Sequence, residues 1–147
     1  MKVLLQRVRR ASVTVDDQVV GSIGLGLVAL VGVELGDGPE DARRMAEKTA
    51  LLRIFPDAAG RFHRSVRDCE GEVLVVSQFT LMADTRRGRR PSFTQAAPPE
   101  VAELVVEQFA TGLTSHGVGT ATGRFGAHMV VALENDGPVT LLLQSRE

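Results

Sequence analysis

The sequence of 147 residues has little of what marks several common protein classes. A single cysteine, Cys69, excludes an internal disulfide, and no cluster of cysteine and histidine has zinc spacing. No apolar run approaches the roughly 20 residues of a membrane span. The apolar stretch after Lys2 is too short and too charged for a signal peptide. These absences predict a cytoplasmic protein.

Excess charge of one sign is also lacking. The 17 basic and 18 acidic side chains leave a net charge of -1, so no global field attracts a polyanion. Any contact with nucleic acid must therefore come from a local basic patch. The length fits one domain, which we expect to span residues 1–147.

Runs of apolar and β-branched residues predict the strands. They cover residues 1–8, 12–15, 19–23, 27–33, 62–66, 73–76, 129–133 and 139–143. The turn-like cluster at residues 16–18 predicts a hairpin, and the segment Glu134–Pro138 predicts a second hairpin at the end of the chain. Residues 119–126 are expected to form a loop of small residues.

Two helices are predicted from proline and acidic residues followed by apolar residues at helical spacing. The first starts at residues 37–41 and runs to about Leu52, and the second starts at residues 98–100 and ends near His116. Strands and helices do not alternate strictly. The pattern therefore predicts an α+β fold, with a mixed, mostly antiparallel sheet or barrel-like core and two packed helices.

The apolar run Val73–Val76 ends abruptly in the polar side chains of Ser77, Gln78 and Thr80. A strand buried on both faces is rigid, and a rigid strand can hold reactive groups in place. The ordinary alternative is that these residues finish the strand and hydrogen-bond a turn.

Four arginines, Arg86, Arg87, Arg89 and Arg90, surround Gly88 in a segment without apolar periodicity. The segment is expected to be an exposed loop. Arginines concentrated in this way suit contacts with phosphate, although a solvated run of charge is an equal alternative.

The three histidines, at positions 63, 116 and 128, lie at neither metal-ligand nor base spacing, so we interpret them as structural or surface residues. The segment Asn135–Pro138 is typical of a tight turn. Its Gly137–Pro138 unit also presents main-chain carbonyls with no side chain in front. Such a rigid unit could select substrates by steric exclusion.

Several motifs together resemble one family, the D-aminoacyl-tRNA deacylases, also called the D-tyrosyl-tRNA deacylase family. The matching segments follow the family's order and spacing over essentially the whole chain. They are residues 6–8 (QRV), 11–13 (ASV), 32–34 (GVE), 77–81 (SQFTL), 90–93 (RPSF), 122–126 (TGRFG) and 135–140 (NDGPVT).

The resemblance implies an enzyme that hydrolyses the ester joining a D-amino acid, or glycine, to the terminal adenosine of tRNA. It releases free tRNA and spares L-aminoacyl esters, which is proofreading in translation. No metal or organic cofactor is implied. The family is a homodimer with active sites at the subunit boundary, where Ser77, Gln78, Phe79 and Thr80 of one chain meet Gly137–Pro138 of the other. The Gly-Pro bond is cis in the family.

The chemistry adds expectations about single residues. Backbone N–H groups near Phe79 and Thr80 could stabilise the oxyanion of the ester carbonyl. Because no base stands beside Thr80 in the sequence, we expect it to position the substrate while the ribose hydroxyl of the tRNA assists an attacking water. Phe125 and Met129 are candidates for the adenosine pocket, with core packing as the alternative. Many family members carry asparagine where His63 stands, which leaves the role of that position open.

Two other classes of function fit the same residues. One is a module that binds the tRNA end without turnover, anchored by Arg86–Arg90. The other is a hydrolase for another small ester, in which the arginines would not affect the rate.

Overall fold

The computed structural model describes residues 1–146 of the chain. In chain order the elements are β1 (Lys2–Val15), β2 (Gln18–Ile23), β3 (Gly26–Gly32), α1 (Pro39–Leu51), β4 (Phe55–Pro56), β5 (Phe62–Arg64), β6 (Glu72–Ser77), the 3-10 turn η1 (Phe79–Met82), α2 (Pro99–Ser115), β7 (Gly119–Thr122) and β8 (Val130–Gln144). Within the described residues, no helix is long and apolar enough to cross a membrane.

The strands other than β4 and β5 form one mixed sheet, in the order β2-β1-β3-β6-β7, with β8 along the other edge of β1. The pairs that β1 makes with β2, β3 and β8 are antiparallel, whereas β3–β6 and β6–β7 are parallel. The N-terminal half of β1 pairs with β3 and its C-terminal half with β2. This long strand therefore forces the sheet to bend.

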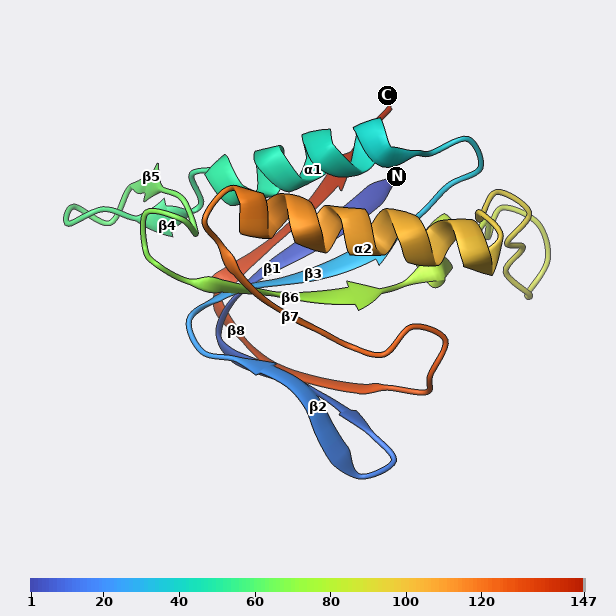
Figure 1. The fold of residues 1–147 in the computed structure, drawn as a ribbon, viewed down its shortest axis with the longest axis horizontal. Helices are drawn as coiled ribbons and strands as arrows, with labels where there is room; N and C mark the ends of the chain where they lie inside the picture. The colour runs from blue at the N-terminus through green and yellow to red at the C-terminus, as the bar shows by residue number, and fades with distance from the viewer. Residues whose placement is uncertain (147) are drawn as a thin grey trace.

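The bend nearly closes the sheet into a barrel. Gly21 of β2 lies so close to β7 that an added Cβ would stand 2.5 Å from the carbonyl oxygen of Thr122, so only glycine fits there. Both helices cover one face of the sheet and lie side by side (Figure 1). The prediction of an α+β fold with a barrel-like mixed sheet and two packed helices is confirmed.

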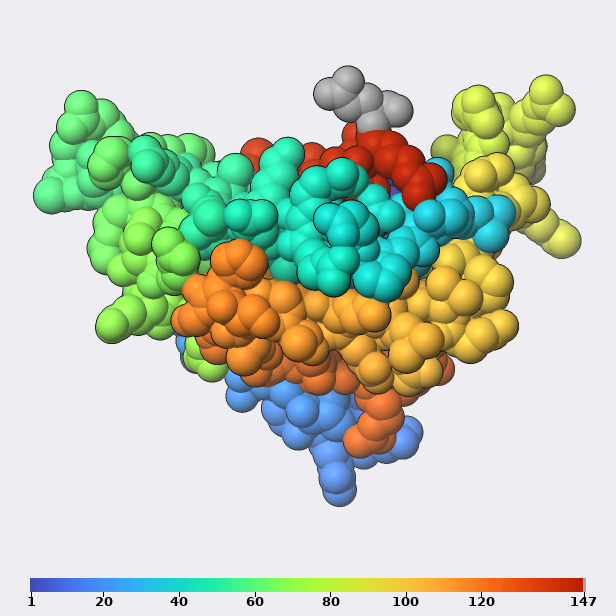
Figure 2. Space-filling model, turned by 45° about the horizontal axis from the view of Figure 1, so that its top comes forward, coloured from blue at the N-terminus to red at the C-terminus, as the bar shows by residue number. Residues whose placement is uncertain are grey.

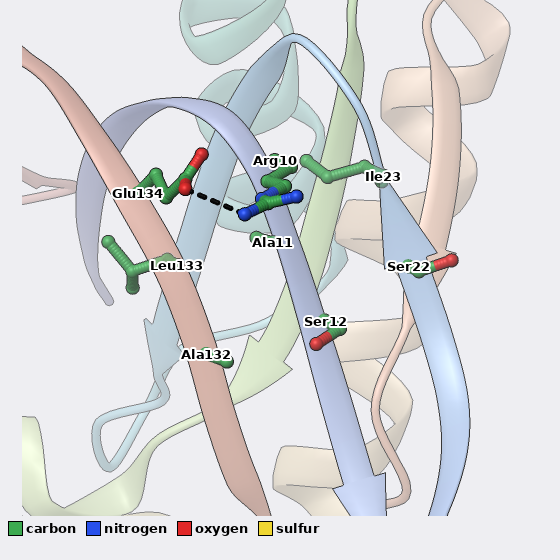
Figure 3. A pocket seen from close by; sticks show the side chains of 8 residues that line it. All are labelled: Arg10, Ala11, Ser12, Ser22, Ile23, Ala132, Leu133 and Glu134. Carbon is green, nitrogen blue, oxygen red and sulfur yellow. Dashed lines mark hydrogen bonds and ion pairs between the residues drawn. The ribbon is translucent and has the colours of Figure 1, made fainter.

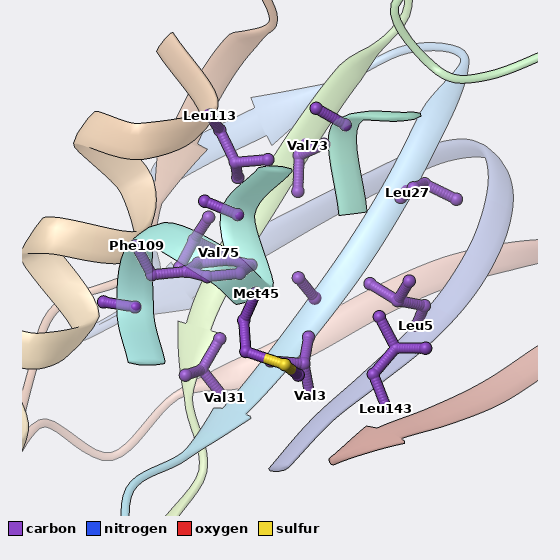
Figure 4. Packing of buried hydrophobic residues seen from close by; sticks show 14 of the residues in the cluster. Val3, Leu5, Leu27, Val31, Met45, Val73, Val75, Phe109, Leu113 and Leu143 are labelled. Atoms are coloured by element: carbon purple, nitrogen blue, oxygen red, sulfur yellow. The ribbon is translucent and has the colours of Figure 1, made fainter. Parts of the chain in front are cut away.

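The main core fills the space between the helices and the sheet (Figure 4). Phe109 of α2 and Met45 of α1 are fully buried against the strands. A second cluster lies inside the curved sheet. On β6, Val73 and Val75 belong to the first cluster, and Leu74 and Val76 belong to the second. The prediction of a strand buried on both faces is therefore confirmed.

Two local predictions are wrong. Residues 130–144 form one continuous strand and not a hairpin, because β1 is long enough to pair with both halves of β8. Asn135 pairs with Val8 and Thr140 with Gln6, so the residues between them bulge opposite Arg7. Residues 119–122, expected in a loop, form strand β7 at the edge of the sheet.

Candidate active site

A cavity of about 710 Å³ opens where β6 ends. Its walls come from the ends of β3 and β6, the start of η1, residues 93–102 that lead into α2, and residues 125–131. The lining residues are Val31, Val33, Val76, Ser77, Gln78, Phe79, Phe93, Ala96, Ala97, Pro98, Pro99, Ala102, Phe125, Gly126, Ala127, His128, Met129 and Val131. The cavity is thus mainly apolar, with a few polar groups at the strand end.

The predicted polar strand end lies at this cavity. The parallel pairing of β6 with β3 extends to Ser77, and the backbone N–H of Gln78 donates to the carbonyl of Val31 over 2.8 Å. The Gln78 side-chain amide donates to Oγ1 of Thr80. Ser77, Gln78 and Phe79 line the cavity, whereas Thr80 is exposed beside it.

The start of η1 offers backbone donors. The N–H groups of Phe79 and Thr80 open the 3-10 turn, where the turn itself supplies no acceptor for them. Both groups stand at the strand end that borders the cavity.

Aromatic side chains form another part of the wall. The rings of Phe79 and Phe93 meet edge to face, with centroids 5.0 Å apart. Phe125 and Met129, the predicted adenosine-pocket candidates, are half-buried and line the same cavity. The sequence analysis gave no role in the site to Phe93, although Phe93 stands in the RPSF segment. It interpreted His128, which also lines the cavity, as a structural or surface residue.

The Gly137–Pro138 unit lies elsewhere in the chain. Its peptide bond is cis, as the resemblance implies. It belongs to the bulge opposite Arg7, which pairs with Leu27 near the start of β3, whereas Ser77 pairs with Val31 near its end. Leu27 and Val31 are four residues apart on β3. At a rise of roughly 3.3 Å per residue, the bulge and Ser77 are therefore about 13 Å apart along the strands. The chain does not bring the predicted site residues together by itself.

Comparison with known proteins identifies the family of the chain. The sequence model described as D-Tyr-tRNA(Tyr) deacylase matches residues 4–144. The chain belongs to this family. A D-aminoacyl-tRNA deacylase of Roseiflexus sp. (strain RS-1) is 63% identical over 145 residues, which cover 99% of this chain and 94% of that protein. The family predicted from the motifs is confirmed.

Solved structures agree with the family fold. One described as c-Myc DNA Unwinding Element Binding Protein has a TM-score of 0.92 at 40% identity, and the match covers 100% of both chains. Another, described as a probable eukaryotic D-amino acid tRNA deacylase, has a TM-score of 0.83 at 18% identity and covers 97% of each chain. The second likeness supports the fold alone.

In this deacylase-family chain, Arg7 holds the segment before Gly137. Its side chain is almost fully buried, Nε donates to the Asp136 carbonyl over 3.0 Å, and Nη1 donates to the Ile54 carbonyl over 2.7 Å. The guanidinium also lies over the ring of Phe55, with its carbon 5.8 Å from the ring centroid. A desolvated cation with these partners fixes the backbone on the N-terminal side of the Gly-Pro unit.

The four predicted arginines are exposed and do not line the main cavity. They occupy a loop that projects beside the N-terminal end of α2 (Figure 1). His63 is exposed on the short strand β5, also outside the cavity.

A smaller hollow of about 340 Å³ lies on β1, β2 and β8 (Figure 3). An ion pair of 2.9 Å between Arg10 and Glu134 lies at one end of it. It also contains Ser12 and Ser22, but none of the predicted site residues. Within residues 1–146, no group of three or more metal-ligating side chains gathers anywhere.

Proposed function

We propose that this chain performs the reaction of its family in the cavity at the end of β6. The chain is a D-aminoacyl-tRNA deacylase, an ester hydrolase. One observation supports this location of the active site. Ser77–Phe79, Phe93 and Phe125–Met129, segments distant in sequence and mostly within the family motifs, converge on one cavity. Its apolar walls and polar end suit an adenosine that carries an aminoacyl ester.

The proposed mechanism relies on positioned groups and needs no activated nucleophile. The N–H groups of Phe79 and Thr80 stabilise the negative charge that develops on the ester carbonyl oxygen. Thr80, held by the Gln78 side chain, positions the ester. Water attacks with assistance from the ribose hydroxyl next to the ester. The acyl-oxygen bond breaks, and the proton passes to the departing ribose oxygen.

Selectivity is assigned to Gly137–Pro138 of a second copy of the chain. The unit is exposed and lies about 13 Å along the strands from Ser77, which supports a site built from two chains. The main-chain carbonyls that it presents would clash with the side chain of an L-amino acid and leave room for a D-amino acid. Glycine has no side chain to exclude, so glycyl-tRNA is also a substrate.

The proposed setting is a homodimer of single-domain chains, acting in the cytoplasm to remove mischarged amino acids from tRNA. The exposed surface of strand β8 supports the proposal that a second copy binds. The strand pairs with β1 along one edge, and Val130 and Leu142 on it are at least half exposed. Exposed apolar residues on a long edge strand are typical of a surface that another chain covers.

The deciding experiment follows the loss of ester from D-aminoacyl-, L-aminoacyl- and glycyl-tRNA in parallel. We expect the D-ester and the glycyl ester to be lost and the L-ester to be spared. Equal loss of the D- and L-esters would contradict the role of Gly137–Pro138. Binding of tRNA without any loss would favour the module that only binds the tRNA end.

A matched pair of variants tests the location. Gln78→Ala, at the cavity, should lower kcat/KM for the D-ester. Gln18→Ala, at the exposed start of β2, should not change it. Equal activity of both variants would place the reaction elsewhere.

A further inference from the structure

The arginines lie on a closed loop. We name residues 84–92 the arginine loop. At its base, the N–H of Asp84 donates to the Ser92 carbonyl over 2.8 Å, and the N–H of Ser92 donates back to the Asp84 carbonyl over 2.9 Å. At its tip, Gly88 has a φ of 71°, a left-handed conformation that favours glycine. The loop therefore has a defined base and turn.

Arg86 differs from the other arginines because it is bound within the loop. Its Nε donates to Oδ1 of Asp84 over 2.9 Å, its Nη2 donates to Oδ2 over 2.7 Å, and its backbone N–H donates to Oδ1 over 3.0 Å. This two-pronged pairing holds the pKa of Asp84 well below its ordinary value and raises the pKa of Arg86. The guanidinium of Arg86 is thus already occupied by the Asp84 carboxylate.

Arg87, Arg89 and Arg90 are exposed, and within residues 1–146 none of them forms an ion pair. Since Asp84 balances Arg86, the loop presents three positive charges on a chain whose net charge is -1. The loop projects from the surface (Figure 2, yellow-green, upper right). A hollow of about 540 Å³ lies beside it, lined by Asp84, Arg86, Arg87 and Ser92.

Both ends of the loop are continuous with walls of the active-site cavity. Asp84 follows the turn η1, which begins at Phe79, and Ser92 directly precedes Phe93. An adenosine seated in the cavity would therefore have the phosphates of the preceding nucleotides near the loop.

We propose that the pair of Asp84 and Arg86 braces the arginine loop, so that Arg87, Arg89 and Arg90 contact the phosphodiesters just before the terminal adenosine of tRNA. The inference rests on the proposed function. It divides four similar residues into one structural and three that bind. The planar guanidinium matches phosphate geometry, and these contacts carry no sequence information, so the loop would serve any tRNA.

The first test measures equilibrium binding of uncharged tRNA as a function of salt. Each contact with a single-stranded phosphate contributes about 0.7 to the slope of log K against log salt. Arg87→Gln, Arg89→Gln and Arg90→Gln should therefore each lower the slope by about 0.7. Arg86→Gln should lower the slope by less than any of these three, and the control Arg43→Gln on the exposed face of α1 should leave it unchanged. Equal slopes for all five variants, or a drop for Arg86→Gln equal to the others, would overturn the proposal.

The brace has its own readout. Arg86→Gln should speed hydrogen exchange at the Ser92 amide, which donates across the base of the loop, whereas Arg87→Gln should not. Unchanged exchange in Arg86→Gln would contradict the bracing role.

The second test compares a tRNA ester with a D-aminoacyl-adenosine, which has the same ester but no phosphate. Replacing Arg87, Arg89 and Arg90 together with Gln should raise KM for D-aminoacyl-tRNA by about 100-fold near 0.1 M salt and leave cleavage of the adenosine ester unchanged. If the native chain cleaves neither ester, the proposed function fails. If the native chain cleaves the tRNA ester and the triple variant matches it, only this inference fails.

Discussion

At the scale of single residues, the hydrogen bond between Gln78 and Thr80 bears most directly on the reaction. It connects a side chain in the cavity wall to the Thr80 hydroxyl, which the sequence analysis expects to position the substrate. Thr80 is exposed and does not line the cavity. Its surroundings therefore favour a positioning role, because an unactivated hydroxyl is a poor nucleophile.

Replacing Thr80 with Ala should leave measurable deacylation. One positioning hydrogen bond contributes about 1 kcal/mol, so kcat/KM for D-aminoacyl-tRNA should fall by about tenfold or less. Thr80→Ser keeps the hydroxyl and should stay near the native value. Ester loss is measured after checking folding and tRNA binding of each variant. Undetectable activity in a folded Thr80→Ala variant that binds tRNA would make the hydroxyl essential to the chemistry.

Replacing Gly137 with Ala should destabilise the fold. The φ of Gly137 is 134°, which side chains rarely adopt, and an added Cβ would lie 2.8 Å from Cγ2 of Val139. We expect the free energy of unfolding to fall by more than about 1 kcal/mol. The control Gly24→Ala, whose Cβ would meet nothing within 4 Å, should change it by less than about 0.5 kcal/mol. Denaturant titrations measure both values, and equal stability of the variants would contradict the strain at Gly137.

At the scale of elements, short polar turns fix the ends of the buried strands. Before β6, the N–H of Ser65 donates to Oδ2 of Asp68 over 2.8 Å, and the N–H of Asp68 donates to the Ser65 hydroxyl over 3.1 Å. Ser65 is buried. This reciprocal pair sets where the chain leaves β5 and enters the central strand.

The contribution of Asp68 to stability should depend on pH. The hydrogen bond from the Ser65 N–H, with that of the Ser65 side chain, lowers the pKa of Asp68 in the folded state. Its contribution is therefore full above the unfolded pKa of about 3.9 and is lost as the pH falls below that value. Asp68→Asn should lower Tm at pH 7, and the difference from the native chain should shrink below about pH 4.

The control for this prediction is Asp17→Asn, which removes an exposed carboxylate in the turn between β1 and β2. It should leave Tm nearly unchanged at both pH values. A Tm difference for Asp68→Asn that is the same at pH 7 and at pH 3 would show that the charge of Asp68 is not involved.

At the scale of the whole molecule, the separation between the cavity and the Gly137–Pro138 bulge has the largest consequence. The cavity lies at one end of the parallel strands, and the Gly-Pro bulge lies opposite the other end. If both act on one substrate, two chains must combine. A surface that joins them should include the outward face of β8.

Leu142 on β8 tests this assembly. It is 50% exposed and pairs with Leu4 of β1. Leu142→Glu should convert a dimer into monomers and abolish deacylation, because a charge at an apolar interface is left without a partner. Leu104→Glu, on the exposed side of α2, should leave the dimer intact. Sedimentation gives the oligomeric state. A monomeric variant that still cleaves D-aminoacyl-tRNA and spares L-aminoacyl-tRNA would show that one chain suffices.

The sequence predicted the parts of the fold that depend on local pattern. Helical spacing of apolar residues predicted α1 and α2, and continuous apolar runs predicted β3 and β6. It failed at β8, where residues 134–138 have the composition of a tight turn. There, pairing with the long strand β1 outweighs the local preference, and the turn-like residues become a bulge.

The sequence by itself determined the family, the helices, the central strands and the residues of the proposed strand end, because motifs and periodicities are properties of neighbours in the chain. Only the tertiary structure decided that Phe93 and His128 join that cavity, that Gly137–Pro138 lies away from it, and that Arg86 is bound by Asp84. The first two depend on pairing between distant strands, and no local pattern encodes such long-range contacts. The third joins residues only two apart, but it depends on the conformations of both side chains.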